Sequence, residues 1–544
     1  MLHLSLLVVF SLVSWLLSQH FLRRPTVPKG LRPVPGPSGL PLLGNTLQLG
    51  PHPHRKIIEW SREYRDLFKV RIGYEDWVFL NSPTAVRDIL DKQSATTSGR
   101  NPFPVLSDII SGGKRFLFMT YTPEWRKLRA MVHKLLTPKA SQTFRPSQEF
   151  EAKQLVHDIL TDNANQENFY MHVRRYTTSV VLTSTYGKRV PVWDCDDVRE
   201  IYGIMEEFSE SALPGAFLAD IFPPLTKLPS TLQWWRPRAL MYYERQSKTW
   251  MNYWNSLQSQ IAKNVAPECF VKQWHDAGFH KEGMDEVQAA FVAGISPALI
   301  EAGSETTSAT LNSAIKYLAA FPKTQQTAHD ELLRVIGEKR SPTFDNEASL
   351  PYIRAIVKEI LRIRPITTMG SPHYTTADVI YKDMFIPKDT IVSLGQYAIH
   401  YDPTRWENPE TFEPARYLNY PLTAGAYASR ADANERDHFS FGAGRRICPG
   451  IHLTENSLFI TLAKILWAFE IRPPLGADGT EESVDVSDEA YAPGMNTLPN
   501  PYKICFIPRS TQIERTLRAE WEKARVEGFL LGNVRVNTAG MVAN

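Results

Sequence analysis

One cysteine of this chain lies in a setting that fits neither a structural nor a disulfide cysteine. The stretch FGAGRRICPG, residues 441–450, surrounds Cys448 with glycines and arginines, and the chain of 544 residues has only four cysteines and no C-x-x-C pair. Glycines let the backbone approach a flat ligand, while amide N–H groups, a following helix N-terminus and Arg446 favour a thiolate over a thiol. One thiolate cannot complete a zinc or iron–sulfur site, but it can be the axial ligand of a haem iron, whose porphyrin supplies four other ligands. A reactive or buried loop cysteine is the alternative.

A second group of chemically active residues lies in ALIEAGSETTSATL, residues 298–311, inside a long apolar helical run. Small and polar residues in mid-helix are unfavourable by helix propensity, and here they are Gly303, Ser304, Glu305, Thr306 and Thr307. A helix pair packed through small residues is one explanation of the pattern. The adjacent acid and hydroxyl, Glu305 and Thr306, instead favour a proton relay to a buried oxygen ligand.

Two further stretches offer charged groups at helical spacing. In KEILRIRP, Glu359 and Arg362 share a helix face, and FEPARY adds Arg416, so we expect a structural network of three residues. In another predicted helix, Trp125 and Arg129 present an indole N–H and a guanidinium on one face. Such donors suit a buried anion such as a haem propionate, although an amphipathic helix with a buried tryptophan would look the same.

The elements that must position these residues are mostly helical. Helices are predicted around 145–162, 196–211, 238–263, 284–320, 322–337, 350–363 and 449–469, and Thr122-Pro123-Glu124 starts another. Strand-like runs are LFKVRIGY and DWVFL, and later VIYKDMFIP and TIVSLGQY, whereas 405–440 is loop-like. We therefore predict an α-rich single domain with a small β part. The tail, 509–544, contains a charged amphipathic helix that we expect to pack on the surface.

The beginning of the chain predicts a membrane anchor. Residues 2–22 contain no Asp, Glu, Lys or Arg, and a helix of this length spans roughly 30 Å, about one hydrocarbon core. A cleaved signal peptide is the alternative, but no basic n-region and no A-x-A-like site is present. The proline-rich residues 23–50 predict a stiff hinge. By the positive-inside rule, four basic residues place the rest of the chain in the cytosol: Arg23, Arg24, Lys29 and Arg32.

Composition excludes several other classes of protein. Charged residues make up 22% of the chain and hydrophobic residues 43%, which is ordinary for a globular protein. The formal net charge of +3 gives no sign of a nucleic-acid partner. There is no phosphate-binding glycine motif and no flavin domain, so any electrons must come from another protein.

The loop at 441–450 resembles the haem-binding signature of the cytochrome P450 family, and the similarity extends over about residues 33–508. The resemblance implies a cytochrome P450 fold: an anchor at 1–22, a hinge at 23–50, a single large catalytic domain at 51–508 and an extension at 509–544. It implies haem b, with Cys448 as axial ligand of the iron, Thr306 at the dioxygen site and Glu305 passing protons. The implied cofactor-binding residues are Cys448, Arg446, Trp125, Arg129, His373, Phe441, Gly444 and Gly450.

By the same resemblance, the chain is expected to be a haem-thiolate monooxygenase that inserts one atom of O₂ into a lipophilic substrate. It looks most like fungal members that tailor secondary metabolites. Eukaryotic microsomal members imply NADPH–cytochrome P450 reductase as partner and a single-pass location in the endoplasmic reticulum membrane. The expected reductase-binding surface is basic: Arg126, Lys127, Lys134 and Arg445.

Two other functions stay open at this point. One is a haem isomerase or dehydratase that acts on a peroxide without O₂ or reductase, and the other is a non-catalytic haem sensor or carrier. Neither needs a proton relay, so Glu305 and Thr306 favour the monooxygenase. The expected substrate pocket is largely apolar: Phe103, Phe116, Leu117, Phe118, Leu299, Ala302, Ile366 and Met495.

Overall fold

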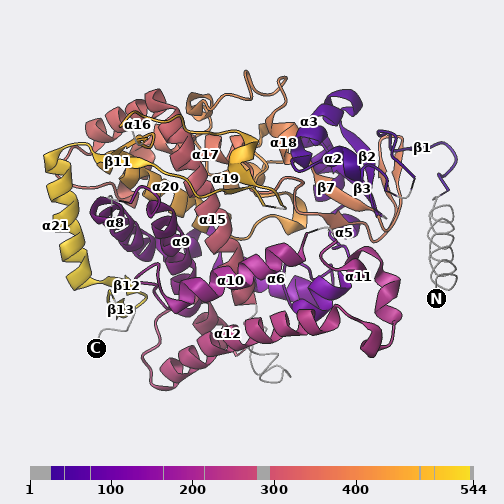
Figure 1. Ribbon diagram of the computed structural model, residues 1–544, viewed down its shortest axis with the longest axis horizontal. Helices are drawn as coiled ribbons and strands as arrows, with labels where there is room; N and C mark the ends of the chain where they lie inside the picture. Colours follow the sequence, from indigo (N-terminus) through magenta and orange to yellow (C-terminus); the bar gives the residue numbers. More distant parts are fainter. Residues whose placement is uncertain are drawn as a thin grey trace.

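The computed structural model describes residues 26–41, 43–73, 75–162, 165–213, 215–278, 295–476, 479–494 and 496–538. Helices fill most of the molecule; strands β1, β2, β3 and β7 lie at one end, and β11, β12 and β13 lie at the opposite end (Figure 1). The predicted α-rich architecture with a small β part is therefore confirmed. Within the described ranges, none of the helices has the length and hydropathy needed to cross a bilayer. The predicted anchor at 1–22 lies outside the described residues.

The helices that the sequence predicted are present where the structure describes the chain, and the structure adds several more. Residues 284–294 of the helix predicted at 284–320 lie outside the described residues. They are α2 (Thr46–Leu49), α3 (Pro53–Tyr64), α4 (Pro83–Val86), α5 (Ser94–Thr97), α6 (Pro123–Leu135), α7 (Pro138–Gln142), α8 (Arg145–Thr161), α9 (Phe169–Tyr186), α10 (Asp196–Ser211), α11 (Leu218–Ile221), α12 (Arg236–Ala262), α13 (Phe270–Asp276), α15 (Ile295–Ala320), α16 (Pro322–Val335), α17 (Pro351–Ile363), α18 (Gln396–His400), α19 (Ala424–Ala428), α20 (Ile451–Ala468) and α21 (Thr511–Glu527). Short 3₁₀ or π turns include η1 (Arg87–Asp91), η2 (Pro104–Ile110), η4 (Ser230–Leu232), η7 (Pro414–Tyr417) and η9 (Gly444–Arg446). The predicted helix start is confirmed, because the Thr122 hydroxyl accepts a hydrogen bond from the Trp125 N–H at 3.2 Å.

The largest sheet has the order β2-β3-β7-β4, with β2 (Leu67–Ile72) antiparallel to β3 (Glu75–Leu80) and β3 parallel to β7 (Ile391–Leu394). β4 (His373–Tyr374) closes it antiparallel to β7, pairing His373 with Val392. A second sheet has the order β1-β6-β5. The remaining strands are β1 (Arg32–Pro33), β5 (Val379–Tyr381), β6 (Met384–Ile386), β8 (Phe469–Arg472), β9 (Tyr491–Ala492), β10 (Leu498–Pro499), β11 (Cys505–Pro508), β12 (Phe529–Leu531) and β13 (Val534–Val536).

Helix α15 runs through the middle of the molecule and packs along α9 (Figure 1). A Cβ on Gly303 would approach Val181 Cγ2 to 2.7 Å, so the glycine permits this close helix contact. The alternative explanation of this stretch, a helix pair packed through small residues, thus applies at Gly303. The sequence did not reveal α9, because its residues are buried almost all round and show no polar face.

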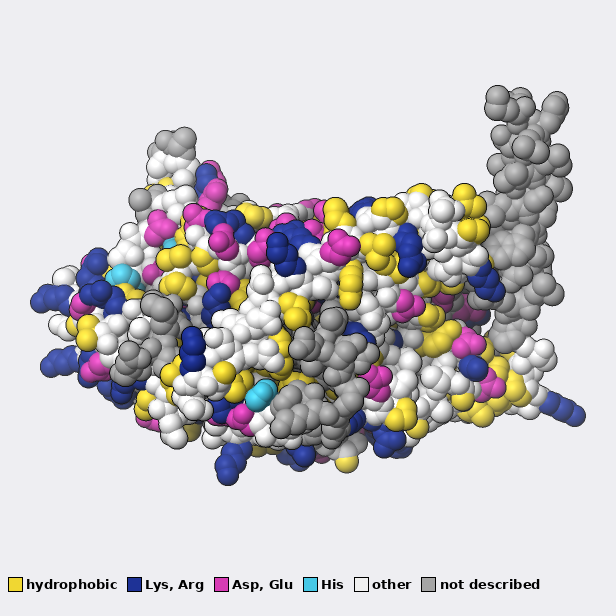
Figure 2. Space-filling view, turned by 90° about the horizontal axis from the view of Figure 1, so that it is seen from below, with side chains coloured by type: hydrophobic (Ala, Val, Ile, Leu, Met, Phe, Trp, Pro, Cys, Tyr) yellow, Lys and Arg dark blue, Asp and Glu magenta, His cyan; other side chains and the backbone are white. Residues whose placement is uncertain are grey.

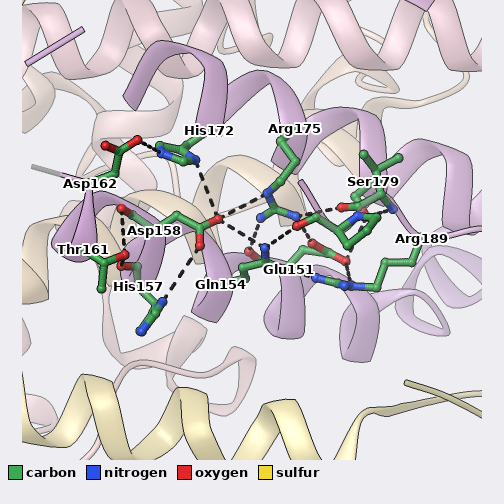
Figure 3. A network of polar contacts seen from close by, with 12 residues as sticks. Glu151, Gln154, His157, Asp158, Thr161, Asp162, His172, Arg175, Ser179 and Arg189 are labelled. Atoms are coloured by element: carbon green, nitrogen blue, oxygen red, sulfur yellow. Dashed lines mark hydrogen bonds and ion pairs between the residues drawn. The ribbon is translucent and has the colours of Figure 1, made fainter. Parts of the chain in front are cut away.

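A buried polar network joins α8 to α9 (Figure 3). Glu151 lies between two arginines: Arg175 Nη1 donates to Oε2 at 2.5 Å, and Arg189 Nε lies 2.6 Å from Oε1. Ser179 also donates to Oε1 at 2.8 Å. Because all of these side chains are withdrawn from water, the carboxylate must be paired to remain charged, and both helices are held by the pairing.

Both ends of the described chain pack against the body. The prolines of the predicted hinge are extended as expected, but β1 pairs with β6 and the Lys69 N–H donates to the Pro35 carbonyl at 2.7 Å. The segment is therefore attached to the sheet rather than free. At the other end, the predicted tail helix α21 is present, and the unpredicted β12–β13 hairpin buries Phe529 against Phe150 of α8.

The predicted network of Glu359, Arg362 and Arg416 is confirmed. Both Glu359 and Arg362 are fully buried, with Arg362 Nε and Nη2 donating to the carboxylate at 2.7 and 2.8 Å, and Arg416 Nε donating at 3.1 Å. Arg362 also donates to the His400 carbonyl at 2.9 Å, and His400 Nε2 accepts from the Phe439 N–H at 2.8 Å. These bonds link α17 to the segment that leads into the Cys448 loop.

Candidate functional site

The Cys448 loop is a tight turn held by backbone bonds just before α20. The Cys448 N–H donates to the Phe441 carbonyl at 2.9 Å, and the Gly444 N–H donates to Asp91 Oδ1 at 2.9 Å. Gly444 has φ +65°, and a Cβ there would lie 2.3 Å from the Leu90 carbonyl oxygen. This glycine is therefore required by its left-handed conformation and by close packing on η1, and its place beside a flat ligand stays a prediction.

The electrostatics of the sulfur differ in part from the sequence expectation. Burial raises the pKa of the Cys448 thiol, while the Gly450 N–H and Arg129 act in the opposite direction. Arg446, which we expected to favour the thiolate, instead donates to the carbonyls of Ser98 and Met119 at 2.8 Å. Of the two arginines, it is Arg129 whose charge lowers the pKa of the Cys448 thiol. Its guanidinium donates a hydrogen bond to the carbonyl of Ile447, the residue before the cysteine.

A cavity separates the Cys448 loop from α15. It contains about 880 Å³ of empty space, part of it open to solvent, and Cys448 and Thr306 both line it. Most of the other lining side chains are apolar and come from α9, α15 and α20, including Val180, Leu299 and Leu453. A thiol on one side and a hydroxyl on the other thus face a single apolar chamber.

Thr306 and Glu305, the adjacent hydroxyl and acid of α15, have different hydrogen-bond partners. Thr306 Oγ1 donates to the Ala302 carbonyl, four residues back, at 2.6 Å, and α15 remains helical there. Glu305 accepts a hydrogen bond from Asn496 Nδ2 at 2.9 Å. Burial raises the pKa of Glu305, whereas the hydrogen bond from Asn496 and the positive charge of Arg174 act to lower it. Asn496 was not predicted, because it reaches Glu305 from a loop almost two hundred residues away.

Beside the cavity, the structure brings together a cluster of three arginines, of which Arg100 is buried and Arg129 and Arg446 are half-buried. Arg446 stacks over the indole of Trp125, with the guanidinium carbon 3.8 Å from the ring centre. Burial, together with the neighbouring charges of Arg100 and Arg129, lowers the pKa of Arg446 to about 8. Among the described residues, no carboxylate forms an ion pair with these three arginines. The buried indole Nε1–H of Trp125 also has no acceptor.

His373 and Arg100 complete this cluster. His373 Nδ1 is 2.8 Å from the Thr97 carbonyl, and burial with Arg100 nearby lowers the pKa of the imidazole to about 3, so it is neutral. Arg100 Nε donates to the Leu117 carbonyl at 3.0 Å, and burial lowers the pKa of Arg100 to about 10. Arg100 was missed from the sequence, since SGRNP carries no recognisable motif.

Such a cluster requires an anion, because buried charges without partners are costly. The two propionates of a haem would supply two negative charges, and the sulfur of Cys448 lies in the adjoining cavity. The residues present therefore fit haem b.

The predicted pocket residues do not all meet at one place. Leu299 and Ala302 line the cavity. Phe116 stacks on Trp125 with ring centres 5.5 Å apart, and Phe103 packs on Phe118 at 5.9 Å. Leu117, between two of these phenylalanines, is 39% exposed, and the Ile366 carbonyl accepts a hydrogen bond from the Thr497 N–H. Met495 lies outside the described residues.

Comparison with known proteins identifies the family. The sequence model of cytochrome P450 matches residues 34–506. The chain belongs to the cytochrome P450 family. It is 42% identical over 513 residues to the cytochrome P450 monooxygenase pgmC of Aspergillus terreus, covering 94% of this chain and 93% of that protein. It is 38% identical over 499 residues to the cytochrome P450 monooxygenase verL of Clonostachys rogersoniana, covering 91% and 90%.

This cytochrome P450 is therefore an oxidoreductase of the monooxygenase type with a protoporphyrin IX haem as cofactor, as the motifs predicted. The family also implies a small-molecule substrate and a redox partner that supplies electrons.

Replacement of Arg100 by Met tests the cation cluster. We expect Arg100→Met to bind haem at least about tenfold more weakly, because one of the cations that faces the propionates is lost. Haem content per protein, measured after passage over a desalting column, gives the result. Arg145→Met, which removes an arginine paired with Glu347 at 2.8 Å, is the control. Equal haem retention in the two variants would contradict a role of Arg100.

Proposed function

We propose that this cytochrome P450 holds its haem through Cys448 as axial thiolate ligand and oxidises a lipophilic intermediate of fungal secondary metabolism. The observation that carries the proposal is the single cavity lined by both Cys448 and Thr306, next to buried cations that lack a carboxylate partner among the described residues. The bound haem supplies activation of O₂ with two electrons and insertion of one oxygen atom into a C–H or similar bond, the other atom leaving as water.

The chain's own residues have three tasks in this proposal. Arg100, Arg129, Arg446 and the indole N–H of Trp125 bind the propionates, with neutral His373 as a further hydrogen-bonding group. Thr306 donates a hydrogen bond to the Ala302 carbonyl, so its oxygen can accept a hydrogen bond from a donor in the cavity. Burial raises the pKa of Glu305, which favours the protonated carboxyl that a proton relay to Thr306 needs.

The proposed electron donor is NADPH–cytochrome P450 reductase. Arg126 and Lys134 are exposed on α6, which also carries Trp125 and Arg129, and Arg445 is exposed in the cysteine loop. With Lys127, these residues form the basic surface on the Cys448 side of the molecule. A basic surface attracts an acidic partner and speeds the encounter.

The proposed location is the endoplasmic reticulum membrane, with residues 1–22 as a single anchor and the body in the cytosol. Exposed leucines support contact with lipid: Leu40, Leu43 and Leu47 lie in the predicted hinge, and Leu218 and Leu232 lie on α11 and η4. Figure 2 shows hydrophobic side chains at the end of the molecule where Figure 1 places β1 and α11.

Substitution of the cysteine tests the central proposal. We expect the reduced protein with carbon monoxide to show the far-red-shifted Soret band of thiolate ligation, and Cys448→Ala to lose this band and all product formation. Cys195→Ala, in a half-exposed cysteine, should keep both. An unchanged band in Cys448→Ala would overturn the assignment. Product formed from a peroxide substrate without NADPH would favour the isomerase, and no NADPH-linked turnover of any substrate would favour the sensor.

Substitution of Thr306 tests the proton relay. In Thr306→Ala we expect NADPH consumption to continue while product per NADPH falls about tenfold or more, because proton delivery at the oxygen side is lost. Thr310→Ala is a matched control, since Thr310 makes the same kind of bond, to the Thr306 carbonyl at 2.9 Å, one turn further on. Product and peroxide are measured against NADPH. Equal coupling in the two variants would remove Thr306 from the relay.

Charge reversal tests the reductase surface. We expect Arg126→Glu with Lys134→Glu to raise the KM for reductase about tenfold at low salt, and the effect to shrink as ionic strength rises. The control is Lys523→Glu on exposed α21, at the opposite end of the molecule from β1 (Figure 1). A KM that is the same in both variants would exclude this surface.

A further inference from the structure

A buried ion pair lies beside the cavity and has no part in the cofactor site. Arg115, in the loop before α6, donates through Nη2 to Glu301 of α15, and their side chains are only 7% and 11% exposed. Arg115 Nη1 and Glu301 Oε1 are both buried and have no hydrogen-bond partner among the residues that the structure describes. One donor and one acceptor are thus left unpaired next to each other, at a cost that a structural ion pair does not require.

The pair borders the region where a substrate must lie. Glu301 directly precedes Ala302, and Leu299 and Ala302 both line the cavity. The Arg115 guanidinium carbon lies 3.9 Å from the ring centre of Phe208, and Phe208 in turn packs on Phe118 at 5.7 Å. The guanidinium of the pair therefore lies against the first of two packed aromatic rings, Phe208 and Phe118, which suit a flat, lipophilic molecule.

The charge of the pair limits the ligand that can use it. Arg115 and Glu301 neutralise each other, so an additional buried charge would have no partner. An uncharged group with an acceptor beside a donor matches the free N–H and the free carboxylate oxygen. We propose that Arg115 and Glu301 form the polar end of the substrate site and bind an uncharged lipophilic substrate through a carbonyl oxygen with a neighbouring N–H or O–H, as in an amide, lactam or hydroxy-ketone.

This inference rests on the proposed function and adds a geometric consequence. Glu301 and Thr306 are five residues apart on α15, which is about 7.5 Å along the helix axis. The substrate carbon that is oxidised near Thr306 lies at about this distance from the group that Arg115 and Glu301 bind. The pair thus fixes which end of the substrate faces the haem.

Two probes of equal shape test the proposal. 2-Naphthamide carries an acceptor and a donor side by side, and 2-isopropenylnaphthalene has the same outline without either. Affinities are measured with the haem-loaded full chain by the shift of the Soret band, and independently by the rise in unfolding temperature. The variant is the double replacement Arg115→Met with Glu301→Leu, because removing one partner alone would leave a buried charge.

We expect the double variant to lose about tenfold in relative affinity for the amide over the hydrocarbon. A control double variant, Arg145→Met with Glu347→Leu, removes a similar pair whose arginine lies over Phe344 at 4.5 Å, and it should keep the preference of the unaltered protein. A change of less than threefold in the first variant overturns the inference. The reduced carbon monoxide band reports the proposed function separately, so its loss in the unaltered protein would indicate a different failure.

A second variant decides the matter if the double variant does not fold. Glu301→Gln keeps the size of the side chain but leaves Arg115 as an uncompensated cation. If these atoms face the substrate, 2-naphthoate should bind to Glu301→Gln at least about threefold more tightly than to the unaltered protein, relative to the hydrocarbon. Unchanged naphthoate binding would show that the pair is structural only.

Discussion

Buried positive charge without a counter-charge is the constraint on which this structure depends. Burial, together with the nearby charges of Arg100 and Arg129, lowers the pKa of Arg446 to about 8, and no described carboxylate pairs with these three arginines. The loop of Cys448, helix α6 and strand β4 all contribute to this cluster. The two negative charges of a haem would pair with these arginines and remove the cost of their unpaired charge. Haem binding would then stabilise the packing of the three segments against one another.

Helix α15 serves two requirements on different faces. Gly303 lets α9 approach, and a side chain there would meet Val181. Thr306 and Ala302 face the cavity, while Glu301 and Glu305, one turn apart, are held by Arg115 and Asn496. These small and acidic residues are unfavourable for an isolated helix. They are explained here by the packing on α9, by the cavity and by the pairing of the two acids with Arg115 and Asn496.

The sequence predicted those parts of the site whose chemistry is local. The Cys448 loop, the acid and hydroxyl of α15 and the shared face of Trp125 and Arg129 are each visible within fifteen residues. Contacts across the fold were not predictable, because Arg100, Asn496 and Arg115 meet their partners from distant segments. Likewise, α9 shows no amphipathic pattern because both of its faces are buried. The packing of Gly444 on Leu90 was also not predictable, because the two residues are far apart in the sequence.

The C-terminal hairpin has a practical meaning for recombinant versions of the enzyme. Arg189 of the buried network donates to the carbonyl of Thr538, and Phe529 packs on Phe150 of α8. A truncation after residue 508 would leave an aromatic face and a buried guanidinium in water at the end of α8. Affinity tags and fusion partners at the C-terminus therefore need a spacer that begins beyond Thr538, so that this hairpin can close first.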